Sequence, residues 1–317
     1  MLDYKIINAK GKDIDLIISM KLDTMLDDEM EKKLSQKEKE KIENNIIINV
    51  KQNISNYKVI CVEDNIAGAY LLYEYEDGFM IDELYILPEF RNNEIGTNIV
   101  NDLKETNAKL FVWVYKHNFR ALSFFEKLGF EKYSNSGKTI ILSFDSIKEI
   151  VLNKLNNISL GYKVKNGCCY MSPQENFRKE YHLQSPKDVL DSKVGLCFDQ
   201  VELERELISK MNVDSRSYIM TYSDDQYEMA HAFLVYKIAN KYYWIENSWV
   251  KYRGIHEYET KDELLKDISK KYINIIDNGK MKKLNMYQYK KPKFGINYIR
   301  FLKNCFNGIE IDVSKIS

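Results

Sequence analysis

The stretch Ser185-Pro-Lys-Asp-Val-Leu-Asp-Ser-Lys-Val-Gly-Leu-Cys-Phe-Asp-Gln-Val-Glu-Leu-Glu-Arg-Glu-Leu-Ile208 carries the clearest structural signal in the chain. It predicts a short helix, a turn at Gly195 and a second helix that begins at Cys197. The apolar residues of the second helix recur near the helical period: Val201, Leu203, Leu207, Ile208 and Met211. A cysteine at a helix N-terminus lies at the positive end of the helix dipole, which favours a thiolate over a thiol. Cys197 is therefore a candidate nucleophile.

Two later segments supply the groups that such a nucleophile needs. His231 begins the apolar run 231–236, and residues 241–249 predict a following strand that ends in Glu246-Asn-Ser-Trp. The imidazole would act as the base and an acidic or amide side chain would orient it. Glu246 and Asn247 should point to opposite faces of a strand, so only one of them can readily meet His231. We expect Glu246, because a carboxylate stabilises an imidazolium more than an amide does, and Asn247 stays the alternative.

Gly195-Leu-Cys197, His231 and Glu246-Asn-Ser-Trp249 together resemble the core of the transglutaminase-like cysteine enzymes. In that family Gly-x-Cys, His and Asp-x-Thr-Trp follow one another on a helix and two strands. The resemblance covers about a third of the chain directly and implies a papain-related fold in which Cys197, His231 and Glu246 are catalytic. It implies an amidase, peptidase or acyltransferase that forms an acyl-enzyme. Without this context, a buried structural cysteine and a hydrogen-bonded strand histidine would be the simpler interpretation.

The length and the charge distribution of the chain indicate two domains. At 317 residues, two domains of ordinary size are expected. Residues 1–146 hold 19 Lys and Arg against 25 Asp and Glu, whereas residues 147–317 hold 28 against 22. This shift supports domains at 1–146 and 147–317. The most basic stretch, 280–303, interleaves Tyr and Phe with Lys, and we expect a solvated terminal hairpin there rather than a nucleic-acid surface.

The sequence has neither a secretory signal pattern nor a run of about 18 apolar residues, so we expect a cytoplasmic protein without a membrane partner. Its five cysteines are Cys61, Cys168, Cys169, Cys197 and Cys305. They are odd in number and lack Cys-x-x-Cys spacing, which favours reduced thiols over disulfides or a metal site. No metal is expected.

The first half predicts a mixed sheet with flanking helices. Residues 58–63 and 66–73 form an expected hairpin around Asp64-Asn65, and 79–87 a third strand that ends at Pro88. A loop from Arg91 then leads into an amphipathic helix and the strand 109–114. A strand, an amide-rich loop and a helix N-terminus form a physical cradle for a pyrophosphate.

Arg91-Asn-Asn-Glu-Ile-Gly-Thr97 resembles the acetyl-coenzyme A signature of the GNAT N-acetyltransferases, Arg-x-x-Gly-x-Gly/Ala. The segment 118–130, with its Asn, Ala, aromatic pair and Leu-Gly-Phe, is similar to that family's closing helix. The resemblance covers residues 1–146 and implies an α/β acetyltransferase fold joined to an α+β cysteine domain. It implies acetyl-coenzyme A as cofactor, bound by Leu84, Ile86, Arg91, Asn92, Asn93, Glu94, Ile95, Gly96, Thr97 and Asn118.

Two residues depart from the GNAT pattern. Glu94 stands where the first glycine is usual, and Phe125 where many members have a tyrosine that protonates the leaving thiolate. Glu83 is the candidate general base for an incoming amine, although an ordinary strand-edge carboxylate is an equal alternative. The sequence thus predicts a bifunctional acyl-transfer enzyme acting on a small amine or peptide. The alternative is a degenerate GNAT fold that binds coenzyme A or a partner, attached to one catalytic cysteine domain.

Overall fold

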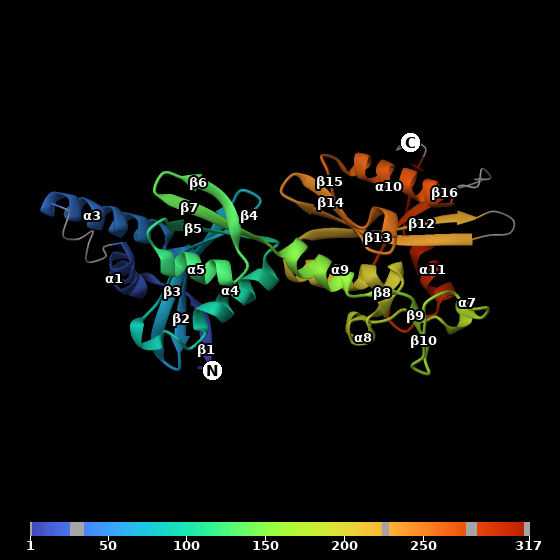
Figure 1. Ribbon diagram of the computed structural model, residues 1–317, viewed down its shortest axis with the longest axis horizontal. Coiled ribbons are helices and arrows are strands. Elements are labelled where there is room, and N and C mark those ends of the chain that lie inside the picture. Colours follow the sequence, from blue (N-terminus) through green and yellow to red (C-terminus); the bar gives the residue numbers. More distant parts are fainter. Residues whose placement is uncertain (1, 26–34, 224–227, 277–283, 314–317) are drawn as a thin grey trace. The chain divides into compact units, whose positions relative to one another are not determined.

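The computed structural model describes residues 2–25, 35–223, 228–276 and 284–313. Its chain divides into two compact units, Met1–Asp145 and Ser146–Ser317. Each unit is built around its own sheet (Figure 1).

The N-terminal unit contains a seven-stranded mixed sheet in the order β1-β2-β3-β4-β5-β7-β6. Its strands are β1 (Tyr4–Asn8), β2 (Tyr57–Val62), β3 (Asn65–Tyr75), β4 (Gly78–Ile86), β5 (Lys109–Tyr115), β6 (Glu131–Ser136) and β7 (Thr139–Asp145). Neighbouring strands run antiparallel except β4 and β5, which are parallel. The crossover that a parallel pair requires is supplied by α4 (Ile95–Thr106).

Helices pack on this sheet through apolar stripes. Ile17 and Met20 of α1 (Ile14–Met25) and Ile46 and Val50 of α3 (Gln36–Asn53) are buried in one cluster with residues of β2 and β3. α4 contacts β4 and β5, and α5 (Phe119–Lys127) follows β5 in the chain. Short helical turns lie at Gly11–Asp13, Ile54–Asn56 and Pro88–Phe90.

Two irregularities of β4 shape the unit. β4 pairs with β5 only from Phe79 to Ile81, so the two strands diverge beyond that point. In the same region the pairing with β3 shifts register, because Leu71 faces Asp82 whereas Ala69 faces Tyr85. One extra residue of β4 is accommodated there as a bulge, and Glu83 within it has a φ of 55°. A bulge changes the direction of strand side chains and commonly lies beside a functional site.

The C-terminal unit contains a six-stranded antiparallel sheet in the order β15-β14-β13-β12-β16-β17. Its strands are β12 (Asp214–Ser223), β13 (Glu228–Ile238), β14 (Lys241–Glu246), β15 (Gly254–Tyr258), β16 (Leu284–Tyr289) and β17 (Ile309–Ile311). Its main helices are α8 (Pro186–Ser192), α9 (Cys197–Lys210), α10 (Lys261–Ile276) and α11 (Tyr298–Phe306). α9 contacts β13, and α10 buries Leu264, Leu265 and Ile268 in the core of the unit.

Shorter elements complete this unit. A π-helix (Ile147–Leu152) leads into α6 (Asn153–Asn156). β8 (Ser159–Leu160), β9 (Tyr162–Lys163), β10 (Cys169–Tyr170), β11 (Val194–Gly195), α7 (Phe177–Glu180) and the turn Val250–Tyr252 are the others.

The expectation of a solvated hairpin within 280–303 is wrong for its described part. β16 pairs with β12 inside the sheet, and Met286 is fully buried. α11 buries Phe301 and Leu302 on one side. The described lysines of this stretch, Lys290, Lys291, Lys293 and Lys303, are exposed, so the charge density concealed an amphipathic pattern.

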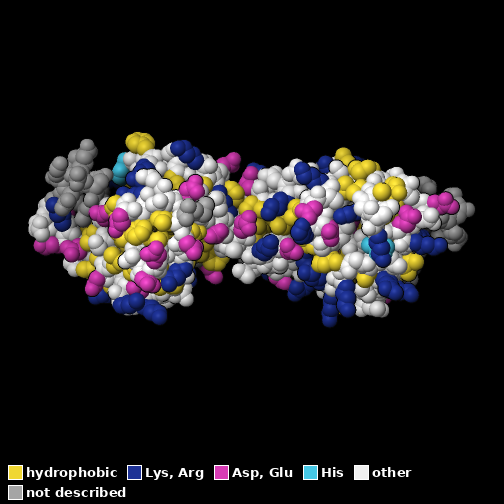
Figure 2. Space-filling model, turned by 90° about the horizontal axis from the view of Figure 1, so that it is seen from below, with side chains coloured by type: hydrophobic (Ala, Val, Ile, Leu, Met, Phe, Trp, Pro, Cys, Tyr) yellow, Lys and Arg dark blue, Asp and Glu magenta, His cyan; other side chains and the backbone are white. Residues whose placement is uncertain are grey.

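The surface in view in Figure 2 intersperses acidic and basic side chains over both units. Within the described part of the chain, no helix is long and apolar enough to cross a membrane. The same residues contain no group of three or more His, Cys, Asp or Glu that could hold a metal ion.

Candidate functional sites

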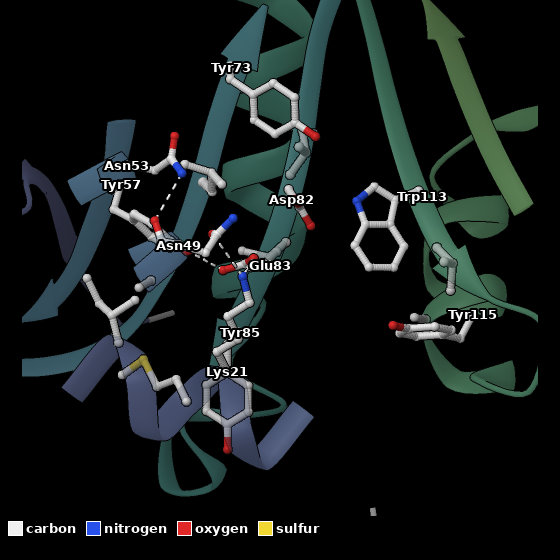
Figure 3. A pocket seen from close by; sticks show the side chains of 18 of the residues that line it. Lys21, Asn49, Asn53, Tyr57, Tyr73, Asp82, Glu83, Tyr85, Trp113 and Tyr115 are labelled. Atoms are coloured by element: carbon white, nitrogen blue, oxygen red, sulfur yellow. Dashed lines mark hydrogen bonds and ion pairs between the residues drawn. The ribbon is translucent and has the colours of Figure 1, made fainter. Parts of the chain in front are cut away.

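A cavity of about 420 Å³ lies where β4 and β5 diverge. Its walls come from α1, α3, β2–β5 and α5, and they are largely apolar and aromatic. The charged residues among those that line it are Lys21, Asp82 and Glu83. Such a concave, mostly apolar site with a few polar groups is typical of small-molecule binding. Figure 3 shows Asp82 on β4 facing Trp113 and Tyr115 of β5 across the gap, whereas Glu83 points toward Lys21 and Tyr57.

Glu83, the base expected from the sequence, is held by two neighbours. Lys21 of α1 and the phenol of Tyr57 each donate a hydrogen bond to its carboxylate. The Lys21 and Glu83 side chains are only 12% and 15% exposed. The positive φ of Glu83 is uncommon for a residue with a side chain, and this ion pair compensates for the strain.

Asp82, which the sequence analysis did not single out, also lines the cavity. Trp113 lies across the gap from it, and hydrogen bonding by this side chain acts to lower the Asp82 pKa. Burial and, to a smaller degree, the Glu83 charge raise the pKa of Asp82 to about 6. The sequence pointed only to its neighbour Glu83. Regular strand alternation would send the two side chains to opposite faces, and the bulge was not foreseen.

The residues expected to bind a cofactor surround the start of α4. Leu84 lines the cavity, and Ile86 accepts a hydrogen bond of 2.8 Å from Arg91 Nε through its carbonyl. The side chain of Asn93 donates to the carbonyls of Phe90 and Arg91, at 3.2 Å each. These bonds within the loop fix its backbone and leave the helix N-terminus as its main anion-binding feature.

Glu94 occupies the N-cap of α4 with a φ of 61° and an exposed side chain, and Asn92 has a φ of 63°. The first helical hydrogen bond runs from Asn98 N to the Glu94 carbonyl at 2.9 Å, so the amides of Ile95, Gly96 and Thr97 precede the helical ladder. They give the N-terminus the donor set that a pyrophosphate requires.

α5 borders the same cavity. Its N-cap Asn118 accepts a hydrogen bond from Ala121 N at 3.0 Å, so this expected cofactor residue also caps a helix. Phe125 is 7% exposed and packs edge-to-face against Phe124 and Phe130. Phenols line the same cavity, among them that of Tyr115 on β5.

A second site lies in the C-terminal unit, where α9 meets β13 and β14. His231 Nε2 lies 2.9 Å from Glu246 Oε2, and Cys197 lines the same small cavity as the imidazole and acts to raise the His231 pKa. His231 and Glu246 are 3% and 2% exposed, whereas Cys197 is partly exposed. The structure thus brings the three sequence-predicted residues together, with the thiol on the accessible side.

Each member of this cluster is held in place. Oε1 of Glu246 accepts hydrogen bonds from Ser248 N at 2.5 Å and Trp249 N at 2.8 Å. The Trp249 ring stacks on the imidazole with centroids 3.8 Å apart. Burial acts to lower the pKa of His231, but the Glu246 charge and the hydrogen bonds with Cys197 and Glu246 outweigh it, and the pKa rises to about 9. The imidazolium form is therefore favoured at neutral pH.

Asn247, the alternative partner of His231, bonds elsewhere. Its side-chain amide donates to the carbonyl of Leu155 at 2.8 Å and to Oε1 of Gln200 at 3.1 Å. Gln200 Nε2 in turn donates to the Gly195 carbonyl at 2.9 Å. These bonds join the loop before α9 to the end of β14.

The start of α9 is fixed by Asp199, which is completely buried. Its carboxylate accepts hydrogen bonds from Leu196 N at 2.9 Å, Gln184 N at 2.8 Å and the Tyr181 hydroxyl at 2.8 Å. Burial raises the pKa of Asp199 to about 7, against the opposing effect of these bonds. A carboxylate three residues after the N-cap is a familiar helix-start feature, and it positions Cys197 at the first turn.

Glu204 is another carboxyl that the sequence analysis missed. It is 3% exposed and lines the cavity of about 10 Å³ beside Cys197 and His231, which has room for about one water. Burial, followed by the Glu246 charge, raises the pKa of Glu204 well above its usual range. Its position seven residues after Cys197 predicts the same helix face, and this spacing was the signal in the sequence.

Comparison with known proteins identifies the first unit. A family model described as an acetyltransferase (GNAT) domain matches residues 54–132. The matched segment runs from β2 to β6 and includes β4, its bulge, α4 and α5. The N-terminal unit therefore carries a GNAT acetyltransferase domain, as the resemblance implied.

Solved structures with weaker likeness were also found. A protein from Pyrococcus horikoshii OT3 is 20% identical with a TM-score of 0.36, covering 45% of this chain and 98% of that one. The PaiA N-acetyltransferase from Thermoplasma acidophilum, solved with coenzyme A, is 19% identical with a TM-score of 0.34, covering 45% and 99%. A GNAT acetyltransferase from Staphylococcus aureus Mu50 is 13% identical with a TM-score of 0.37, covering 45% and 99%. No curated protein matches the sequence.

Proposed function

We propose that the N-terminal unit is an acetyl-coenzyme A-dependent N-acetyltransferase acting on a small amine. The observation that carries the proposal is the cavity between the diverging strands β4 and β5, within the segment that matches the GNAT family model. One of the similar solved structures is a complex with coenzyme A.

In this proposal, acetyl-coenzyme A supplies an activated acetyl group as its thioester. The amides of Ile95, Gly96 and Thr97 hold its pyrophosphate at the positive end of α4. A carboxylate of β4 takes a proton from the substrate ammonium, since only the neutral amine is nucleophilic. Glu83 was expected for this step from the sequence, and Asp82 shares the cavity with it.

Equilibrium binding of acetyl-coenzyme A tests the first part, and release of free thiol with a panel of amines tests the second. Tight binding with amine-dependent thiol release supports the acetyltransferase. Binding without release from any amine supports instead the alternative of a coenzyme A-binding module.

A second function is favoured by the His231–Glu246 distance of 2.9 Å, with Cys197 lining the same small cavity. We infer that the C-terminal unit is a transglutaminase-like cysteine enzyme, an amidase, peptidase or acyltransferase. The whole chain would then be a bifunctional acyl-transfer enzyme.

The chemistry follows from the roles of the three residues. The Cys197 thiolate attacks a substrate carbonyl, and the backbone N–H of Cys197 at the helix start helps hold the oxyanion. His231 protonates the leaving amine and then activates water or a second amine to release the acyl group. Glu246 keeps the imidazole oriented and supports its positive charge.

Alkylation with mass mapping tests this proposal. We expect Cys197 to react fastest of the five cysteines at neutral pH, ahead of Cys168 and Cys169, which are exposed but have no imidazole partner in the described structure. His231→Ala should remove that advantage. Equal labelling of Cys197 and the exposed pair, in wild type and variant alike, would contradict it.

A further inference from the structure

Asp82 and Glu83 are adjacent carboxylates in one cavity, but their surroundings differ. Glu83 is bound by the ammonium of Lys21 on α1 and the hydroxyl of Tyr57 on β2. Both members of the Lys21–Glu83 pair are largely buried. To accept a proton from a substrate, Glu83 would have to give up an ion pair that also supports its strained backbone.

Asp82 has no cation in hydrogen-bond contact in the described structure. The indole of Trp113 stands across the gap between β4 and β5, and its interaction with the carboxylate acts to lower the Asp82 pKa. In Figure 3 the Asp82 carboxylate points into this gap, toward Trp113 and Tyr115, on the side of β4 away from Lys21. A carboxylate that is not paired with a cation keeps lone pairs for a substrate.

The charge of the cavity also favours Asp82 over Glu83 as the group that binds a substrate. Because Lys21 and Glu83 neutralise each other, Asp82 is the uncompensated charge among the described lining residues. Around it stand the rings of Tyr73, Trp113 and Tyr115. An ammonium is attracted both to a carboxylate and to aromatic faces, and rings of this size also pack against a carbon chain.

Building on the proposed acetyltransferase function, we propose that Asp82, rather than Glu83, is the catalytic residue that binds and deprotonates the substrate, an alkyl- or arylalkylamine whose carbon chain packs against Trp113 and Tyr115. Glu83 is then a positioning residue that holds the bulge through Lys21 and Tyr57.

The reaction balances as follows. Asp82 takes one proton from R–NH₃⁺, and the nitrogen lone pair attacks the acetyl carbonyl. The new C–N bond forms, the C–S bond breaks, and the sulfur receives the second nitrogen proton. Asp82 then releases its proton to solvent, so that an ammonium and a thioester give an amide, a thiol and one H⁺.

The environment also suits Asp82 to this task. Burial first, and the charge of Glu83 next, raise its pKa to about 6, near the pH at which a base is both deprotonated and strong enough. The ionisable groups facing it are Glu83 on β4, Lys21 on α1, Tyr57 on β2, Tyr73 on β3 and Tyr115 on β5; α3 and α5 present Asn49, Asn53 and Asn118.

The test compares Asp82→Asn with its matched control Glu83→Gln in the full-length chain, using an amine that wild type accepts. For wild type, kcat/KM should rise as the pH rises through about 6. Asp82→Asn should lower kcat/KM by roughly 10²-fold or more and abolish this rise. Glu83→Gln should cost less than about tenfold, keep the rise, and move it to lower pH because a like charge is removed.

A second measurement needs no turnover. The NMR signal of the Trp113 indole N–H, assigned with Trp113→Phe, should titrate with a midpoint near pH 6 in wild type and not in Asp82→Asn. A flat titration in wild type, or a pH profile lost in Glu83→Gln and kept in Asp82→Asn, overturns the proposal.

The outcomes distinguish the role of Asp82 from the acetyltransferase activity itself. Retained amine acetylation in Asp82→Asn overturns the role of Asp82 and leaves the acetyltransferase intact. Acetyl-coenzyme A binding without thiol release from any amine overturns both. Unchanged affinity for acetyl-coenzyme A in Asp82→Asn shows that the variant is folded.

Discussion

Glu94 shows how a single side chain can be tolerated at a position that favours glycine. With a φ of 61°, its backbone is left-handed, a conformation that glycine adopts without cost. The exposed carboxylate extends from the N-cap of α4 into solvent, so its charge is screened from the expected pyrophosphate site. Glu94 therefore differs from the glycine of the GNAT pattern in its side chain, but it keeps the backbone conformation that glycine favours.

We expect Glu94→Gly to tighten acetyl-coenzyme A binding by less than about fivefold, because an exposed charge acts weakly on a bound anion. Glu94→Gln, which removes the charge but keeps the side chain, separates electrostatics from backbone freedom. Isothermal titration measures both. Weaker binding of Glu94→Gly would show that Glu94 itself contributes to the site.

The roles of Glu246 and Asn247 can be distinguished through their effects on the charge of His231. Glu246→Gln removes the carboxylate that raises the pKa of His231, and should lower the rate of acylation by p-nitrophenyl acetate roughly 10²-fold or more. In wild type the imidazolium is present below the His231 pKa and is lost as the pH rises through about 9. Glu246→Gln should lose it at a lower pH than wild type does.

Asn247→Ala is the matched control for that change. It breaks the bonds to Leu155 and Gln200 but leaves the His231 pair intact, so the cost should stay below about tenfold. A larger loss in Asn247→Ala than in Glu246→Gln, with both variants folded, would transfer the orienting role to Asn247.

At the scale of the element, α9 depends on how its first turn is held. Asp199→Ala leaves Leu196 N, Gln184 N and the Tyr181 hydroxyl without their buried acceptor. We expect the free energy of unfolding to fall by about 2–3 kcal/mol and Cys197 alkylation to slow as the helix start loosens. Denaturant titration and iodoacetamide kinetics measure the two effects.

Asp188 provides the control, because it lies at the equivalent position of α8 but at the surface, paired with Ser185. Asp188→Ala should cost under about 1 kcal/mol and leave the alkylation rate unchanged. Equal effects of the two substitutions would mean that Asp199 has no special part in placing the thiol.

Elements with a clear period could be predicted from the sequence, and irregular ones could not. Alternation and the Asp64-Asn65 turn predicted the β2–β3 hairpin, and helical spacing predicted α9. The β4 bulge left no pattern, because one extra residue depends on pairing with β3. The position of Asp82 in the cavity was therefore missed, whereas the proximity of Cys197, His231 and Glu246 was predicted, since their placement follows from regular elements.

At the scale of the whole molecule, two units with separate sheets should unfold as separate transitions. We expect calorimetry to resolve two unfolding transitions. Saturating acetyl-coenzyme A should raise the midpoint temperature of only one of them. At a hundred times Kd the stabilisation is about 2.7 kcal/mol by mass action. A single transition that shifts as a whole would instead show that the two units unfold cooperatively.

The stack of Trp249 on His231, with centroids 3.8 Å apart, gives the cysteine site a built-in optical signal. A positive imidazole held on an indole face is stabilised by the ring and draws electron density from its excited state. Emission from Trp249 should therefore be quenched while His231 is charged and brighten once the proton leaves. The protein would report the charge state of its own base in ordinary buffer, before any substrate for it is known.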